Sequence, residues 1–185
     1  MSEANKTKKI MIASSVYGFE TPLIQMCALI EGLGFRAMNS HYGTIVPDSK
    51  LSNLENCINA VAECDVFIGI IRPFYGTGVI GDLSITHTEF REAIRLDKRR
   101  YFLAHDDVLF CRKLLKQFMY DEKNVRTDFR IKKTTVLDDI RVIDLYDEVV
   151  KNHVPVEDRT GNWIQQFKTQ EELYRFLNTI LEAEK

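Results

Sequence analysis

The sequence has no hydrophobic run that approaches the roughly 20 residues a membrane-spanning helix needs. Its first nine residues are polar and lack the apolar core of a signal peptide. The chain also has little excess of either charge: its formal net charge is −2, whereas nucleic-acid-binding domains usually carry a strong basic excess. We therefore expect a cytoplasmic protein that binds neither a membrane nor nucleic acid directly.

Cysteine is scarce, and its four positions show no metal-site or redox pattern. No two of them form a Cys-x-x-Cys pair, and no histidine lies at zinc-ligand spacing from them. Cys27, Cys57 and Cys111 fall on the apolar faces of predicted helices, where a reduced cysteine acts as a small hydrophobic residue. These observations predict structural, reduced cysteines, and we expect no metal and no other cofactor.

What the chain does have is a repeated alternation of strand-like and helix-like apolar patterns. Such alternation is typical of parallel strands joined by right-handed crossovers. We predict a single α/β domain over residues 1–185, with 121–139 as a mobile loop and 150–185 as a C-terminal elaboration. The five predicted strands cover residues 10–13, 36–39, 66–71, 101–104 and 141–146. Helical stripes cover residues 23–30, 54–61, 90–94, 108–118 and 169–182.

Parallel sheets of this kind bind ligands beyond the carboxyl ends of their strands, where the strand order reverses. The first loop at that edge, Ser14–Gly18, joins a buried strand to a helix. Its hydroxyl and backbone N–H groups suit a phosphate or a ribose, aided by the helix dipole. Ordinary capping of the next helix explains the same residues, and both interpretations stay open.

The third loop at this edge follows the most apolar predicted strand and carries Arg72 and Tyr75 beside two glycines. Arginine can bind a phosphate or carboxylate with two parallel hydrogen bonds, and tyrosine can stack on a base. The loop matches neither the Walker motif nor the Gly-x-Gly-x-x-Gly pattern. We predict that Arg72 and Tyr75 contact a ligand, while the glycines also suit a purely structural tight turn.

Glu89 lies where the next helix is expected to start, at the mouth of the predicted crevice. The spacing from Thr86 to Glu89 also fits a capping box, in which the glutamate accepts from the N-cap amide. The pairs Ser52/Glu55 and Thr169/Glu172 have that spacing too. The spacing alone therefore favours a cap, but local chemistry does not decide between a cap and a ligand-facing carboxylate.

Four segments resemble an uncharacterised bacterial domain family that is grouped with TIR domains and nucleoside 2-deoxyribosyltransferases. They are Lys9–Gly18, Cys64–Ile71, Tyr75–Gly76 with Ser84–His87, and Asp158–Trp163. The resemblance spans most of the chain. It implies a flavodoxin-like, TIR-like three-layer sandwich with a central five-stranded, mainly parallel sheet.

The resemblance also bears on Glu89, because enzymes of this wider group use a glutamate near a helix start to act on an N-glycosidic bond. Glu89 with Ala93 matches their Glu-x-x-x-Ala pattern. The implied function is an N-glycosidase or ribosyltransferase for NAD or a related nucleotide, in bacterial defence or signalling. Such a carboxylate stabilises or traps an oxocarbenium-like centre. The alternatives are a non-catalytic module that binds a nucleotide signal, and a homotypic assembly domain that forms homo-oligomers.

Under this resemblance Glu89 is the catalytic residue, and the other candidates contact a nucleotide or nucleoside. The ligand-binding candidates are Ser14, Ser15, Tyr17, Arg72, Tyr75, Asp82, Ser84 and His87. Arg72 is expected near a phosphate and Tyr75 near a base or sugar. Asp82 takes the place of an acidic residue in the deoxyribosyltransferase pattern, although its spacing from Glu89 differs. Trp163, in a segment without a TIR counterpart, is expected to pack against the sheet.

Overall fold

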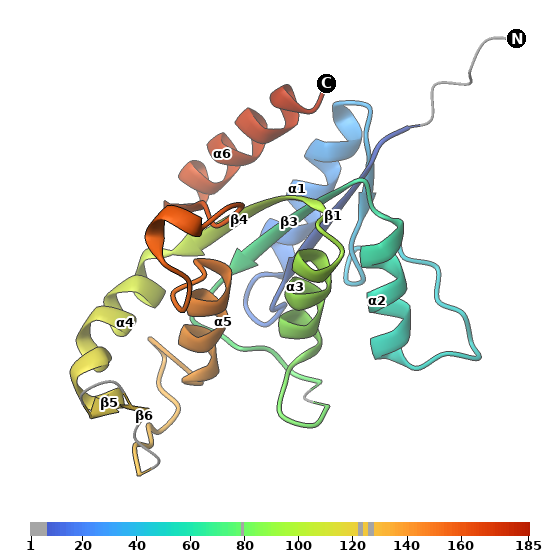
Figure 1. Ribbon diagram of the computed structural model, residues 1–185. Helices are drawn as coiled ribbons and strands as arrows, with labels where there is room; N and C mark the ends of the chain where they lie inside the picture. Colours follow the sequence, from blue (N-terminus) through green and yellow to red (C-terminus); the bar gives the residue numbers. More distant parts are fainter. Residues whose placement is uncertain (1–6, 79, 122–123, 126–127) are drawn as a thin grey trace, which may run out of the picture.

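Five parallel strands form the central sheet of the computed structural model, which describes residues 7–78, 80–121, 124–125 and 128–185 (Figure 1). The strands are β1 (Lys9–Ser14), β2 (Arg36–Met38), β3 (Val66–Ile71), β4 (Arg99–His105) and β7 (Ile164–Phe167). Their order is β2-β1-β3-β4-β7, and each neighbouring pair is parallel. The predicted α/β class is confirmed, and this order is the flavodoxin-like one.

The middle of the sheet is apolar on both faces, as a parallel sheet with helices on each side requires. Side chains alternate along β1, so Ile10 and Ile12 join one core while Met11 and Ala13 join the other. Every residue of β3 is buried. The sheet therefore has no free face, and the ends of its strands are the places left for a ligand.

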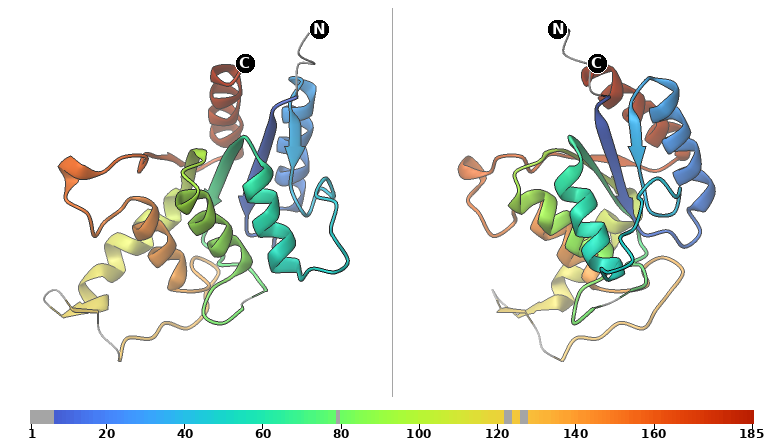
Figure 2. Two further views of the ribbon diagram at one scale, coloured as in Figure 1. Left: turned by 45° about the vertical axis from the view of Figure 1, so that its right-hand side comes forward. Right: turned by 90° about the vertical axis from the view of Figure 1, so that its right-hand side faces the viewer.

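Helices on both faces complete a three-layer sandwich (Figure 2). On one face, Leu23 of the first helix and Leu177 of the last pack in the core that holds Ile10. On the other, Phe90 and Val142 pack in the core that holds Met11. The first face carries α1 (Glu20–Gly32) and α6 (Gln170–Ala183), and the second carries α2 (Asn53–Glu63), α3 (Ile85–Arg95), α4 (Asp106–Met119) and α5 (Arg141–Val149).

The strand predicted at 141–146 is wrong, because these residues begin helix α5. The buried residues Val142, Ile143, Tyr146 and Val149 repeat at helical spacing, which a window ending at residue 146 conceals. The fifth strand is instead β7, which pairs with Phe102–His105 of β4. Its sequence, Ile-Gln-Gln-Phe, carries little strand signal of its own.

The two segments that the sequence analysis separates from the main domain both contribute to the fold. Within 121–139, the expected mobile loop, residues 122–123 and 126–127 lie outside the described residues. The described part holds a short antiparallel pair, β5 (Tyr120–Asp121) with β6 (Asn124–Val125), and buries Leu137. Within 150–185, the expected elaboration, a 3-10 turn at Val156–Asp158 precedes β7 and α6. Strand β7 belongs to the central sheet, and helix α6 packs in the core that holds Ile10.

Two of the predicted capping boxes are confirmed, and the cysteines are buried as expected. Ser52 with Glu55 caps α2, and Thr169 with Glu172 caps α6. All four cysteines are free and buried. Burial raises the pKa of Cys27 and of Cys57 to about 12, so both thiols stay protonated at neutral pH.

Trp163 does not pack against the sheet as expected, because 79% of its surface is exposed. It lies beside a cavity of about 300 Å³ that is also lined by Arg100, Gly161 and Phe176. None of the helices in the described part of the chain has the length and apolar character needed to cross a bilayer.

Candidate functional site

A cavity of about 370 Å³ opens at the carboxyl ends of β1 and β2. Within the sheet, β2 lies on one side of β1 and β3 lies on the other. The strand order therefore reverses at β1, next to this cavity. Four segments form its walls: the end of β1 with the following loop, the loop after β2, the first turns of α2, and the start of α3 with part of the preceding loop. They contribute residues 11–17, 39–40, 45, 47, 53, 56–57, 76–77, 85–86 and 89.

Glu89 lies in the wall of this cavity, on the second turn of α3. It is only 6% exposed, and burial raises its pKa to about 8. The neighbouring Cys57 thiol of α2 lowers the pKa of Glu89, but by less than burial raises it. No lysine, arginine or histidine is among the described residues that line the cavity. Glu89 is therefore a buried acid whose raised pKa favours the protonated form near neutral pH, and the described part of the cavity wall brings no cationic side chain to it.

The predicted capping box at Thr86 and Glu89 is wrong. Helix α3 begins at Ile85, and its N-cap is Ser84, whose hydroxyl accepts a hydrogen bond from the His87 amide at 3.2 Å. Thr86 is therefore inside the helix, and the Glu89 side chain is too far along to close on the N-cap. With capping excluded, Glu89 is left facing the cavity.

The two serines at the end of β1 also line the cavity. The Ser14 hydroxyl makes a long hydrogen bond of 3.3 Å to the Ser15 carbonyl, and the buried Ser15 hydroxyl has no hydrogen-bond partner among the described residues. Gly76 crosses beside them with a φ of +93°, and a Cβ on it would stand 3.4 Å from the Ser15 Cβ. The loop after β3 therefore lies close over a hydroxyl whose hydrogen-bonding capacity is unused.

Tyr17 stands at the mouth of the same cavity and is 69% exposed. Its ring meets the Phe74 ring edge to face, with 5.8 Å between the ring centroids. An exposed aromatic ring at the rim of a polar cavity provides a surface on which a planar group can stack.

Arg72 is not among the residues that line the cavity. It is buried, and one of its guanidinium nitrogens donates to the Ser15 carbonyl at 2.9 Å and to the Tyr17 carbonyl at 3.1 Å. The guanidinium lies 4.2 Å from the centre of the Phe19 ring, and burial lowers its pKa to about 10. These contacts hold the 14–19 loop in shape and keep the guanidinium turned toward the protein.

Tyr75, Ser84 and His87 form a separate buried network on the other side of the loop after β3. The Tyr75 hydroxyl lies 2.7 Å from His87 Nδ1 and accepts from the Ser84 amide at 3.3 Å. The second ring nitrogen of His87 lies 3.2 Å from a Glu148 carboxylate oxygen. Burial of Glu148 opposes its ionisation, but hydrogen bonds from Arg91 and His87 lower its pKa to about 2. This network fastens the loop to α3 and α5.

Asp82 lies apart from Glu89. Together with His87, Arg141 and Asp144 it lines a second, more open cavity of about 500 Å³ beside α5. The structure thus brings Glu89 together with Ser14, Ser15 and Tyr17. It gathers Asp82 and His87 elsewhere, and it turns Arg72 and Tyr75 into the protein.

Sequence reasoning missed several wall residues, among them Asn39, Asn56 and Cys57. The Asn39 amide donates to the Ile12 carbonyl at 2.9 Å and accepts from the Tyr42 amide at 2.9 Å. The Asn56 side chain accepts from the Asp48 amide at 2.7 Å. Both amides shape loops at the cavity rim. The one available signal was that helices after parallel strands start at this edge, which brings the first turn of α2 into the site.

No group of three or more histidine, cysteine, aspartate or glutamate side chains gathers at metal-binding distance among the described residues. The cavity walls offer hydroxyl, carboxyl and aromatic groups to a ligand.

Comparison with protein families matches residues 9–180 to the family described as domain of unknown function DUF4062, and the chain belongs to this family. Among solved structures, a 2-desoxiribosyltransferase from Leishmania mexicana is similar over 80% of this chain and 99% of that one. The identity is 21% and the TM-score 0.43, values too low to carry an argument about function. Comparison with curated proteins gives no match. The relation to TIR domains stays a prediction.

Proposed function

We propose that this member of the DUF4062 family is an N-glycosidase or ribosyltransferase for a nucleoside or nucleotide, NAD included, with Glu89 as its catalytic residue. The observation that carries the proposal is a carboxyl group that is nearly fully buried, lines the cavity at the strand-order reversal, and has a pKa raised to about 8. A buried carboxyl without a cation destabilises a fold when it ionises, and such groups concentrate at functional sites.

The reaction follows from where charge develops. In glycosidic cleavage the anomeric carbon becomes cationic, like an oxocarbenium ion, as the C–N bond breaks and the base leaves with the bonding electrons. A positive centre beside Glu89 favours its ionised form, so the carboxyl gives up its proton as the C–N bond breaks. The proton passes to the leaving base of a nucleoside, or to water where the leaving group is neutral nicotinamide. The carboxylate then stabilises or bonds the anomeric carbon until water or a second base attacks that carbon, and the proton lost by the attacking group returns to Glu89.

The other wall residues suit the parts of such a substrate. Ser14 and Ser15 line the cavity and carry hydroxyls that can hydrogen-bond a ribose, and the exposed ring of Tyr17 can stack on the base. No cation is among the described lining residues, so the proposal puts sugar and base inside the cavity. A phosphate or diphosphate of a nucleotide substrate then extends through the mouth toward solvent.

The test is to incubate concentrated wild-type and Glu89→Gln protein with NAD and with common nucleosides, and to separate the products by chromatography. We expect the wild type to release free base and the variant to lose this turnover at least 100-fold, because an amide cannot act as a carboxylate. Glutamine resembles the protonated acid, so both proteins should melt at similar temperatures at mildly acidic pH.

Glu92→Gln is the matched control, because Glu92 lies on the same helix and pairs with Arg95 at the surface. This control should retain full turnover. Base release that survives Glu89→Gln would contradict the proposed role of Glu89, and absence of base release from every substrate by concentrated wild type would contradict the enzymatic function.

A second candidate function is a non-catalytic module that binds a nucleoside signal. The specific observation in its favour is that the Ser15 hydroxyl, which has no hydrogen-bond partner among the described residues, lines the same cavity as Glu89, and both groups can hydrogen-bond a ribose without any chemistry. Ligand-induced rise of the melting temperature, abolished by Ser15→Ala but without product formation in the wild type, would favour this reading. A role in bacterial defence or signalling rests on the sequence resemblance alone.

A further inference from the structure

The cavity beside Trp163 lies at the edge of the sheet opposite to the Glu89 cavity. Its walls come from the first half of β4, from the segment that leads into β7, and from α6. Parallel strands all begin at the same edge of a sheet, so this cavity lies near the amino ends of β4 and β7. The Glu89 cavity lies at the carboxyl ends of β1 and β2, and the two cavities are therefore separate.

Arg100 lines this cavity and is buried there with part of its hydrogen-bonding capacity unused. Only 9% of its side chain is exposed. One terminal nitrogen donates to the Asp97 carboxylate at 2.8 Å and to the Lys98 carbonyl at 3.0 Å. The buried Nε has no hydrogen-bond partner among the described residues. A buried donor without an acceptor costs free energy, so this guanidinium lacks an acceptor that a ligand can supply.

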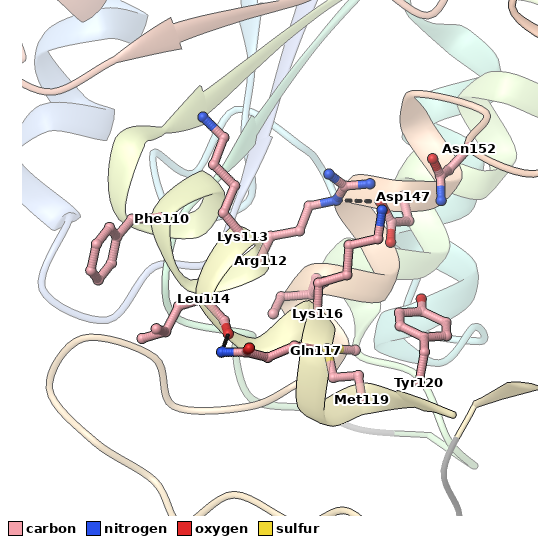
Figure 3. Close-up of a pocket in the computed structure, with 11 residues that line it drawn as sticks. Phe110, Arg112, Lys113, Leu114, Lys116, Gln117, Met119, Tyr120, Asp147 and Asn152 are labelled. Carbon is pink, nitrogen blue, oxygen red and sulfur yellow. Dashed lines mark hydrogen bonds and ion pairs between the residues drawn. The ribbon is translucent and has the colours of Figure 1, made fainter. Parts of the chain in front are cut away.

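Arginines beside other cavities have their partners within the protein. In the groove of about 860 Å³ between α4 and α5, Arg112 pairs with Asp147 at 2.5 Å (Figure 3). Near the Glu89 cavity, Arg72 donates to two backbone carbonyls. In the described part of the chain, Arg100 is the only arginine with a buried side-chain nitrogen that lacks a partner. The unused donor therefore distinguishes the cavity beside Trp163.

The chain passes close to the Arg100 guanidinium at Gly161. Gly161 has a φ of +62°, and a Cβ on it would stand 2.4 Å from a terminal nitrogen of Arg100. Glycine is therefore required there both by the backbone conformation and by the lack of space. Arg159 fixes the preceding turn by donating to the Val154 carbonyl at 2.8 Å. The described backbone thus covers the guanidinium closely without offering an acceptor to its Nε.

The other walls of the cavity are mainly aromatic and aliphatic. Trp163 lines the cavity although 79% of its surface is exposed, so it stands at the mouth. Phe176 and Ile180 of α6 and Leu103 of β4 form further walls. Aromatic side chains of this kind hold a planar ring by stacking or by edge-to-face contact. The volume of about 300 Å³ is at the lower end of small-molecule sites and suits a small ligand with an aromatic ring.

We propose that this cavity binds a small aromatic carboxylate, with its ring against Trp163 and Phe176 and its carboxylate accepting from Arg100. The two oxygens of a carboxylate match two parallel N–H groups of a guanidinium, so they satisfy the donors that the protein leaves unused. Nε is covered in the structure, and the segment around Gly161 moves outward slightly to admit the ligand. Asp97 beside the guanidinium disfavours a doubly charged phosphate. Binding here requires nothing of Glu89.

Trp163 is the only tryptophan in the chain, so its fluorescence reports directly on this cavity. The first test titrates the wild type with benzoate, phenylacetate and 3-phenylpropionate, and with the uncharged amide of each. We expect a saturable change in emission with at least one carboxylate, and binding of its amide weaker by roughly tenfold or more, because the charge-assisted hydrogen bonds are lost. Sodium acetate controls for ionic strength. No saturable change with any carboxylate through the millimolar range, or equal binding of acid and amide, would overturn the proposal.

The second test repeats the titration of the tightest carboxylate with variants. Arg100→Gln should weaken binding roughly tenfold or more. Arg99→Gln is the matched control, because it removes the same charge from the neighbouring residue, which does not line the cavity. It should bind as the wild type does, and so should Glu89→Gln. Arg100→Gln binding as tightly as the wild type, or loss of binding in Glu89→Gln, would contradict the proposed site.

Circular dichroism checks that each variant is folded. If Arg100→Gln does not fold, Arg100→Lys replaces it, because lysine keeps the charge but lacks two parallel donors. Arg100→Lys should also bind the carboxylate more weakly than the wild type, and unchanged binding would count against the proposal. The comparison of each acid with its amide needs no variant and decides the role of the carboxylate by itself.

Discussion

At the scale of the residue, the buried Glu89 of the candidate site should make the free energy of unfolding depend on pH. Its pKa is raised from 4.5 to about 8 in the folded protein, so the folded state keeps a proton that the unfolded chain releases. The stabilisation is complete below about pH 4.5 and is lost as the pH rises toward 8. We expect Glu89→Gln to be as stable as wild type near pH 5 but more stable at pH 8, by up to about 4 kcal/mol.

Urea unfolding of both proteins at pH 5 and pH 8 measures this difference. Other titrating groups, such as Glu148 with its lowered pKa, affect both proteins equally and cancel in the comparison. Parallel stability curves for the two proteins would show that Glu89 ionises normally, and would remove the main support for its catalytic role.

The residues of the site differ in how far the sequence could predict them. Ser14, Ser15 and Tyr17 follow a buried strand directly, so the topology alone puts them at the carboxyl edge. Arg72 and Tyr75 also follow a buried strand, but their long side chains turn toward backbone carbonyls and toward His87. The orientation of these side chains depends on partners that are distant in the sequence. Local sequence patterns therefore cannot predict it.

At the scale of the element, the loop Pro73–Leu83 is held by Tyr75. Its hydroxyl contacts His87 and the Ser84 amide, its amide donates to Asp138 at 2.8 Å, and the Arg141 guanidinium lies 4.5 Å from the centre of its ring. We expect Tyr75→Phe to lower the free energy of unfolding by about 1–3 kcal/mol, because it leaves buried polar groups without their partner.

Tyr174→Phe provides the comparison for that measurement by urea unfolding. The Tyr174 hydroxyl also makes one side-chain hydrogen bond, to Gln25, but in an exposed setting. Its loss should change the unfolding free energy by less than about 0.5 kcal/mol. Equal effects of the two variants would mean that the Tyr75 network does not hold the loop.

The elements near the C-terminus show why part of the fold escaped sequence prediction. The apolar run at 141–146 reads as a strand only when Val149, one turn later, is left out. Strand β7 carries two glutamines because it is the outer strand beside β4, and edge strands need less apolar sequence. Helices with complete stripes, such as α1 and α6, were predicted well because burial of one face repeats over several turns.

At the scale of the whole molecule, the surface has several cavities, and each is a candidate ligand site. The cavity with Glu89 lies where the strand order reverses, the groove of Figure 3 lies between α4 and α5, and a third hollow lies beside Trp163. Parallel α/β sheets bind ligands where the strand order reverses, so the strand order favours the cavity with Glu89 as the ligand site. The volumes of the cavities alone would not favour it.

This argument predicts the pattern of hydrogen exchange when a nucleoside binds. A ligand present at about 100 times its dissociation constant stabilises the folded state by about 2.7 kcal/mol. We expect its local protection to concentrate in residues 14–17, 39–40 and 76–77, which line the cavity around Glu89. Peptides at the α4–α5 groove and around Trp163 serve as internal controls and should exchange as in the free protein. Protection confined to either of those regions would move the ligand site away from Glu89, even if base release were observed.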